Sequence, residues 1–547
     1  VAPPPPPLPS DWPRRVAAAG LHITSTLEAV TALQGAVSEA WGRGGAGGAP
    51  FEVHYAGHPC PSHAGSEHQC AMRCELLGLC DPGSEAADPL AEFLAGAVDT
   101  SNGRFKEREG YSLAEARAAL RWAPRRLDPI RQADMVLCTF PTVLCVLLHE
   151  LFPQTPQLFV AIANPLFAAP GCAGQEDSTV IACDSDEGRE YLTALRGMLA
   201  EPGGPVRGLA GYAVTAALVS YQVGVALPLG GKAGRYLPAG AVWRQEGRPE
   251  ALIARSRFLG TGFGAAFRSL LAEFGRRQQG ALRFVLQQEL GSYLSFEDLS
   301  EFRAVVVFPQ DLGLHKFTEH YAMAMPIWVP AREWAYRLQM FVPWGMVSYS
   351  GTWRAEAEGT PGHERAARLR PPSDHGLFDD AGLRAAHAPH FNAQSVPYSL
   401  AQAAFWYEFS EFVAYPGVQS FGSVPELLST GASADLAAIS ATMRRFRAEL
   451  WQTTRAVYGA AASQLAAHAA AMGHAADTSR AAPRARPLAS GARSRRRPTA
   501  RSRPCRPPPP GASAAARPQP SPWAGGAGGP ALRPQVRAVA ASAPAAR

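Results

Sequence analysis

The chain has 547 residues with a hydrophobic fraction of 47%, enough for two or three globular domains with sizeable cores. Its net charge of +6 is unevenly placed, because 14 of the 52 basic residues lie between Arg480 and Arg547, after the last acidic residue, Asp477. The remainder carries 38 basic and 46 acidic side chains, so it offers no basic face for specific nucleic-acid binding. No run of 18 apolar residues is present, and no membrane-spanning helix is predicted.

The first half of the chain predicts a disordered leader followed by a Rossmann-like lobe. Consecutive prolines in residues 1–15 fix φ and remove backbone donors, which favours an extended, unfolded leader. Residues 16–235 then alternate strands and helices: a helix over Thr24–Trp41, a strand over Phe51–Gly57, the strand–helix pair "ADMVLCTF" and "PTVLCVLLHELF", the strands "PQLFVAIA" and "STVIACD", the helix "EGREYLTALRGML" and the closing segment "VRGLAGY". Short apolar strands between helices predict a parallel sheet covered on both faces.

Residues 236–474 repeat this rhythm and predict a second Rossmann-like lobe. The order is a strand over Ala251–Arg255, the helix "FGAAFRSLLAEFGRRQQ", the strand "LRFVLQQ", the short helix "SFEDLSEF", a strand over Arg303–Pro309, the helix "FTEHYAMA", the strand "PIWVP", and long closing helices. Residues 351–390 form a polar insertion that predicts a surface loop. Residues 475–547 are too poor in large apolar side chains to fold and predict a disordered basic tail. The expected fold is α/β, with two lobes facing a cleft.

One segment of the second lobe carries a resemblance to a known family. Tyr293–Ala331 resembles the donor-binding stretch of two-lobed (GT-B) glycosyltransferases, of the family 4-like or exostosin-like kind. The family has a short helix, a strand ending near Pro, a loop, and a helix that holds a Glu. Its two acidic residues lie eight apart, as Asp311 and Glu319 do, with Asp replacing the usual first Glu.

The resemblance implies an activity. A hexosyltransferase-type enzyme would move a sugar from a nucleotide-sugar donor to an unidentified glycan, protein or lipid acceptor. It would need no cofactor and no bound metal, and Asp311 and Glu319 would be its catalytic residues. The sequence leaves the compartment open between the Golgi lumen and the cytoplasm. Two other functions stay open: a catalytically inactive nucleotide- or sugar-binding protein, and an interaction protein that docks through its Pro-rich and Arg-rich ends.

The resemblance also implies a set of donor-binding residues in the second lobe: Arg255, Arg257, Gly313, Leu314, His315, Lys316 and Thr318. Elementary chemistry agrees at several of them. Free N–H groups and the positive dipole end of a helix that begins near residues 313–316 attract an anion. Gly313 lets the backbone approach a ligand, Lys316 adds a point charge for a diphosphate, and Glu319 can accept hydrogen bonds from sugar or ribose hydroxyls. The alternatives are that Glu319 caps or pairs with an arginine and that Lys316 and Arg257 are solvated surface charges.

Three further groups of residues have more than one interpretation. His58, Cys60, His63, His68, Cys70, Cys74 and Cys80 could hold zinc, form disulfides or carry free thiols. Asp184 and Asp186 could bind a divalent cation or simply favour a helix N-terminus. Trp406, Tyr407 and Glu411 could line the cleft or belong to the core. Cys138, Cys145 and Cys183 lie in apolar strands or helices and are expected to be core residues.

Overall fold

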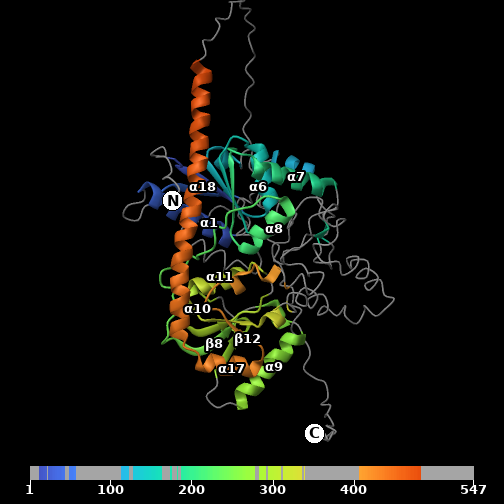
Figure 1. Ribbon diagram of the computed structural model, residues 1–547, viewed down its shortest axis with the longest axis vertical. Helices are drawn as coiled ribbons and strands as arrows, with labels where there is room; N and C mark the ends of the chain where they lie inside the picture. Colours follow the sequence, from blue (N-terminus) through green and yellow to red (C-terminus); the bar gives the residue numbers. More distant parts are fainter. Residues whose placement is uncertain are drawn as a thin grey trace, which may run out of the picture. The chain divides into compact units, whose positions relative to one another are not determined.

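A computed structural model of the protein describes residues 12–20, 23–42, 49–56, 113–121, 127–162, 173–174, 181–182, 186–254, 256–260, 262–277, 282–290, 294–309, 312–335, 338, 404 and 406–481. The polar insertion and almost all of the predicted leader and tail lie outside these residues. Two sheets, each of five parallel strands, belong to one compact unit that ends at Ala482 (Figure 1). The architecture is α/β with two lobes.

The first sheet is built from five parallel strands in the order β2-β1-β3-β4-β7. Their bounds are Arg15–Ala19 (β1), Glu52–Ala56 (β2), Met135–Cys138 (β3), Gln157–Ala161 (β4) and Val206–Ala210 (β7). Every neighbouring pair in this sheet is parallel, as the apolar strands between helices predict. Helices cover both of its faces.

Side chains that alternate along the strands divide between two cores on opposite faces of this sheet. One core contains Val136, Cys138 and Phe159, and the other contains the intervening Leu137 and Leu158. The helices on the first face are α4 (Leu113–Arg121), α5 (Asp128–Arg131), α6 (Thr142–Leu151), α7 (Asp186–Ala200) and α8 (Ala213–Val223). The opposite face is covered by α1 (Ile23–Trp41) and the long helix α18 (Leu436–Ala481), which pack against each other. The two-residue period of a strand produces this division.

Two details of the first sheet differ from the sequence prediction. The segment "STVIACD" does not supply a strand of the parallel sheet: β6 (Ile181–Ala182) pairs antiparallel with β5 (Ala173–Gly174) in a separate two-stranded sheet. The place beside β4 is occupied by β7. The sequence prediction also missed β1, which lies between β2 and β3.

The second sheet has the order β12-β11-β10-β8-β9, again with parallel neighbours throughout. Its strands are Arg248–Ile253 (β8), Phe284–Leu286 (β9), Phe302–Val306 (β10), Ile327–Pro330 (β11) and Gln419–Phe421 (β12). Its helices are α9 (Gly262–Arg277), α10 (Phe296–Ser300), α11 (His315–Ala322), α16 (Glu411–Ala414) and α17 (Val424–Ser433), with the 3-10 turns η3 (Arg257–Gly260) and η4 (Gln287–Glu289). In Figure 1, α9 and α17 run beside each other along one side of this sheet.

Both sheets have the same strand order. Numbering the strands of each sheet along the chain gives 2-1-3-4-5 in both cases. In open parallel sheets of this kind, ligands bind beyond the carboxyl ends of the strands where the order reverses. That point lies between β1 and β3 in the first sheet and between β8 and β10 in the second.

Helix α18 contacts both lobes. Near its start, Ser440 donates a hydrogen bond of 2.7 Å to the carbonyl of Ala324, beyond α11. Further along, Thr454 donates to the carbonyl of Gly230, and Tyr458 is buried in the core of the first lobe. In the part of the chain that the structure describes, neither α18 nor any other helix has the length and hydrophobicity to cross a membrane.

A disulfide joins Cys138 and Cys145, with their Cα atoms 5.6 Å apart. The expectation that these two residues belong to the core is confirmed, because both are fully buried, whereas the disulfide between them was not predicted from the sequence. Cys138 ends β3 and Cys145 lies in the first turns of α6, so the short strand–helix connection brings the two side chains together. Cys183 lies outside the described residues.

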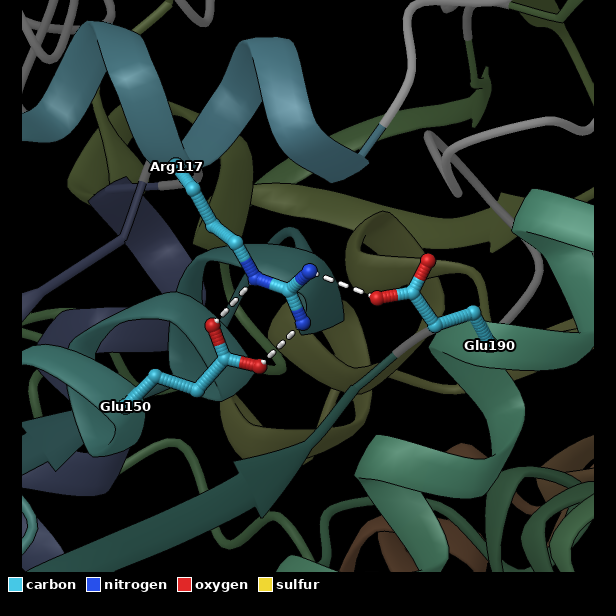
Figure 2. A network of polar contacts seen from close by, with 3 residues as sticks. All are labelled: Arg117, Glu150 and Glu190. Carbon is cyan, nitrogen blue, oxygen red and sulfur yellow. Dashed lines mark hydrogen bonds and ion pairs between the residues drawn. The ribbon is translucent and has the colours of Figure 1, made fainter.

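An ion-pair network ties three helices of the first lobe together. Arg117 of α4 donates from Nε and Nη2 to both carboxylate oxygens of Glu150 on α6, at 2.7 and 2.8 Å. Its Nη1 donates to Glu190 on α7 at 2.6 Å. Figure 2 shows the guanidinium between the two carboxylates. These hydrogen bonds, Glu150 first, raise the pKa of Arg117 further above its usual value.

Candidate functional site

The reversal point of the first sheet is closely packed and polar. Gly20 follows β1, and a Cβ added there would lie 2.1 Å from Oγ1 of Thr139 and 2.8 Å from Oγ1 of Thr26. Thr139 follows β3, and its hydroxyl forms a hydrogen bond of 3.0 Å with that of Thr26 on α1. Only glycine therefore fits between the carboxyl ends of β1 and β3 without displacing these hydroxyls.

The reversal point of the second sheet leads into α11. The segment after β10 runs through Gly313 to Leu314, whose extended backbone precedes the helix and whose side chain cannot cap it. The helix begins at His315, within the predicted interval of 313–316, and its first residues are half-buried. Thr318 is buried and donates its hydroxyl to the carbonyl of His315 at 2.8 Å. The helix thus presents an uncapped amino end beyond the carboxyl end of β10.

His315 joins the two reversal points. Its Nε2 lies 3.0 Å from the Ser25 hydroxyl in the first turn of α1, which follows β1. Its Nδ1 lies 2.8 Å from the Tyr212 hydroxyl, just before α8, and 2.9 Å from Nζ of Lys232. The amino ends of α1 and α11 therefore meet through one imidazole ring, with a lysine beside it.

Lys232 is a buried ammonium from the segment that connects the two sheets. Its side chain is 6% exposed, and Nζ lies 3.4 Å from the Ser25 hydroxyl and 4.3 Å from the centre of the Tyr212 ring. Burial lowers the pKa of Lys232 to about 7, against the opposing attraction of Glu28, Glu411 and Glu319. A lysine with this pKa changes its charge near neutral pH.

Glu28 of α1 fixes the same connecting segment. One carboxylate oxygen accepts hydrogen bonds of 2.9 Å from the backbone amides of Ala233 and Gly234. The other, Oε2, is buried and has no hydrogen-bond partner among the described residues. Burial raises the pKa of Glu28, and Lys232 acts in the opposite direction. Gly234 has φ of +60°, and an added Cβ would lie 2.2 Å from Cβ of Ala322 on α11. The segment is thus held closely between α1 and α11.

Two further carboxylates lie within the protein near this site. Glu319, on α11, is 7% exposed and accepts a hydrogen bond of 2.9 Å from the Tyr236 hydroxyl. Glu411 accepts a hydrogen bond of 3.3 Å from the Ala213 amide at the start of α8. Glu411 is buried, as are Trp406 and Tyr407, which agrees with the core interpretation of these three residues.

Some of the residues that the sequence predicts for the site lie in the described part of the chain, and others lie outside it. Gly313, Leu314, His315, Lys316, Thr318 and Glu319 lie together on α11 and the loop before it, and Arg257 opens the turn η3 after β8. Arg255, Asp311, Asp184 and the residues of the His58–Cys80 cluster lie outside the described residues. Asp186 begins α7, is exposed and pairs with Arg189 at 2.5 Å, as expected at a helix N-terminus. Within the described ranges, no group of three His, Cys, Asp or Glu side chains could hold a metal ion.

Four residues of this site were missed by the sequence analysis: Ser25, Glu28, Tyr212 and Lys232. A usable signal was present in the sequence "GGKAG", residues 230–234, where glycines surround a lysine. Gly231 and Gly234 both have positive φ, at +69° and +60°, so the glycines allow this chain path. The lysine position could have been considered from this pattern alone.

The fold and the site define an α/β protein whose two parallel sheets have their reversal points joined by polar side chains. No protein-family model matches the chain, and no curated protein is significantly similar to it in sequence. Among solved structures, two that the chain matches are the glycosyltransferase of kitacinnamycin and S. aureus MnaA with UDP. The first is 10% identical with a TM-score of 0.34, over 82% of this chain and 98% of that one. The second is 13% identical with a TM-score of 0.30, over 72% and 94%. At these values the likeness carries no argument about activity.

Proposed function

We propose that the protein is a glycosyltransferase that takes a sugar from a nucleotide-sugar donor, with the donor bound where the reversal points of the two sheets meet. The observation that carries this proposal is the hydrogen bonding of His315 to Ser25 and Tyr212, which brings the amino ends of α1 and α11 to one place. Two helix amino ends, each beyond the carboxyl ends of parallel strands, favour binding of a phosphorylated ligand.

Different residues of α11 and of the loop before it would bind different parts of the donor. The amides of the first turn and Lys316 would bind the diphosphate, and Gly313 would let the backbone come close to it. An added Cβ at Gly313 would already lie 3.3 Å from the Tyr212 ring, so this approach is narrow. Glu319 would accept a hydrogen bond from a hydroxyl of the ribose or the sugar. This bond would replace the one that Glu319 accepts from Tyr236 in the free protein.

The reaction needs charge stabilisation more than a covalent intermediate. The anomeric carbon exchanges its bond to a phosphate oxygen for a bond to the acceptor oxygen. The leaving diphosphate keeps the electron pair of the broken bond, and the acceptor hydroxyl releases its proton to water. Positive groups and helix amides that face the diphosphate stabilise the charge that develops on it.

Ligand-induced stabilisation tests the binding step. UDP, GDP and ADP are added separately to the full chain, and the melting temperature is followed. A ligand present at 100 times its dissociation constant should stabilise the protein by about 2.7 kcal/mol. Glu319→Gln should reduce the shift, because an amide replaces the carboxylate that accepts the ligand hydroxyl. Glu297→Gln, a change on the separate helix α10, is the control and should leave the shift intact.

Turnover then separates an enzyme from a non-catalytic binder. The matching nucleotide-sugar should release free nucleotide in the presence of an acceptor mixture, and Glu319→Gln should slow this release. Binding without release would leave the chain as a nucleotide-binding protein that does not transfer sugar. If no nucleoside diphosphate shifts the melting temperature of the wild-type chain, the transferase proposal is wrong.

A further inference from the structure

The connecting segment Gly230–Gly234 places a cation, Lys232, beside the amino ends of α1 and α11. The Gly230 amide donates a hydrogen bond to the carbonyl of Ala210 at the end of β7, and the Gly230 carbonyl accepts one from Thr454 of α18. Glu28 then holds the amides of Ala233 and Gly234. Between these anchors, the side chain of Lys232 extends to Ser25 and His315.

The hydrogen bonding of Lys232 leaves it able to bind an anion. Nδ1 of His315 has one lone pair and receives two possible donors, Lys232 at 2.9 Å and Tyr212 at 2.8 Å. Only one of the two can donate to Nδ1 at a time. When Tyr212 does so, the nearest remaining acceptor of the ammonium in the described residues is the Ser25 hydroxyl at 3.4 Å, a long contact for a charged donor.

The position of Lys232 fits a phosphate better than it fits a role as a counter-ion to Glu28. Within the described residues, Nζ has hydrogen-bonding contacts with a hydroxyl and an imidazole, neither of which is negatively charged. One oxygen of the Glu28 carboxylate accepts from two backbone amides instead, so Glu28 attracts Lys232 without being hydrogen-bonded to it. A buried cation without a bonded anion is unfavourable. A ligand anion beside Ser25 and the amino end of α11 would relieve that cost.

We propose that Lys232 of the connecting segment contacts the diphosphate of the nucleotide donor and is the main positive charge that holds it. This inference rests on the proposed function and assigns the role to a residue outside the predicted set, in which Arg255, Arg257 and Lys316 were the cations. Because the segment lies between the lobes, the same contact makes donor binding depend on both of them.

The charges around Lys232 give the contact a pH dependence. Its pKa is lowered to about 7 by burial, and a bound diphosphate would raise it again. Above pH 7 the free protein therefore loses the proton and must take it up when the ligand binds. The titratable and charged groups that act on Lys232, or on its partner Glu28, come from α1, the turn before α8, the residue after the connecting segment, α11, α16 and its C-terminus, and α18. They are Glu28, Tyr212, Arg235, His315, Glu319, Glu411, Tyr415, Arg447 and Tyr458.

Calorimetric titration of the full chain with UDP, and with GDP in parallel, tests the inference. At pH 8, runs in two buffers of different ionisation enthalpy should show uptake of about one proton per bound nucleotide, and the uptake should disappear at pH 6. Lys232→Met should weaken binding at least about 30-fold, the loss typical of a removed hydrogen-bonded charge. Lys232→Arg should bind with little loss but without proton uptake, because arginine stays charged.

The controls separate this role from structural damage and from other groups. Arg277→Met removes an exposed charge on α9 and should leave both affinity and uptake unchanged. His315→Gln should keep the proton uptake, which assigns it to Lys232. If wild type binds nucleotide but Lys232→Met binds equally well, or if binding at pH 8 takes up no proton, the inference is overturned. If wild type binds no nucleoside diphosphate, the proposed function itself fails. Should Lys232→Met not fold, the wild-type proton uptake and its loss in Lys232→Arg decide the question.

Discussion

The two lobes have the same strand order but are stabilised in different ways. The first lobe packs small side chains closely, as at Gly20 and Ala17–Ala19, and adds a disulfide and an ion-pair network across its helices. The second lobe is filled by aromatic rings: Phe308 stacks on Phe258 at 4.5 Å, with Phe267 at 4.9 Å and Phe421 at 6.3 Å from Phe308. One topology therefore tolerates very different cores, and the loss of a single group should affect the two lobes differently.

The largest expected effect is the loss of an aromatic ring from the second lobe. Phe308→Ala should lower the free energy of unfolding by about 3 to 5 kcal/mol, because the residue is buried and touches three other rings. Urea denaturation combined with amide hydrogen exchange on β10 and β3 would measure the loss and locate it. Phe263→Ala on α9, where the ring is 63% exposed, is the matched control and should change stability by less than about 0.5 kcal/mol. Equal losses in the two variants would contradict the assigned core.

Acid should destabilise the second lobe through His320. Burial, with a smaller contribution from Lys316, lowers the pKa of His320 to about 3 from the usual value of 6.5. The unfolded chain therefore binds more protons than the folded one between these values, and stability falls as the pH drops from 6.5 towards 3. The loss should reach about 3 kcal/mol by pH 4. The free energy of unfolding, measured against pH, should lose this part of its pH dependence in His320→Gln. If the variant shows the same pH dependence as wild type, His320 is not its cause.

Removal of the disulfide should weaken the first lobe by a smaller amount. The double variant Cys138→Ala and Cys145→Ala should lose about 2.5 kcal/mol, as expected for a short cross-linked loop. Hydrogen exchange should speed up in β3 and α6 but not in β10. In wild type, reduction of the unfolded chain should add two titratable thiols from this disulfide. If a reductant leaves the first-lobe exchange rates unchanged, the cross-link does not stabilise this lobe.

The smallest expected effect comes from the ion-pair network of the first lobe. Arg117→Met should destabilise by about 1 kcal/mol, because the charges are partly exposed and water screens them. The difference from wild type should shrink as salt is added. Arg131→Met, which removes a single exposed contact with Asp128 at 3.5 Å, should have a smaller effect. A larger loss for Arg131→Met than for Arg117→Met would show that bridging three helices adds nothing.

The strands that sequence reasoning identified are those whose own residues favour a strand. The runs that contain β3 and β10 are continuous, apolar and partly β-branched. The central strand β1 has the sequence Arg-Val-Ala-Ala-Ala, and alanine does not favour strands. Its position depends on β2 and β3 on either side, which are distant in sequence. Tertiary pairing, rather than local preference, decides this element.

The candidate site was predictable only where it is contiguous in the chain. Residues 313–319 lie on one loop and one helix, so a local pattern could indicate them. The partners of His315 are 290 residues away at Ser25 and 83 residues away at Lys232. The glycines around Lys232 indicate an unusual chain path there, but no local pattern pairs either residue with His315. The packing of the two sheets brings Ser25 and Lys232 next to His315. Their roles in ligand binding are predictions.

Helix α18 has a mechanical consequence. Its 46 residues form an uninterrupted rod about 69 Å long. The rod is bonded to Ala324 behind α11 at one point and packs with Tyr458 and Leu465 in the first lobe at others. A hinge-like opening between the lobes would have to bend this rod or break one set of its contacts. A ligand that enters between the lobes should therefore require only small movements of loops beside this helix. A cut or a helix-breaking proline between Ser440 and Thr454 should leave two loosely connected lobes.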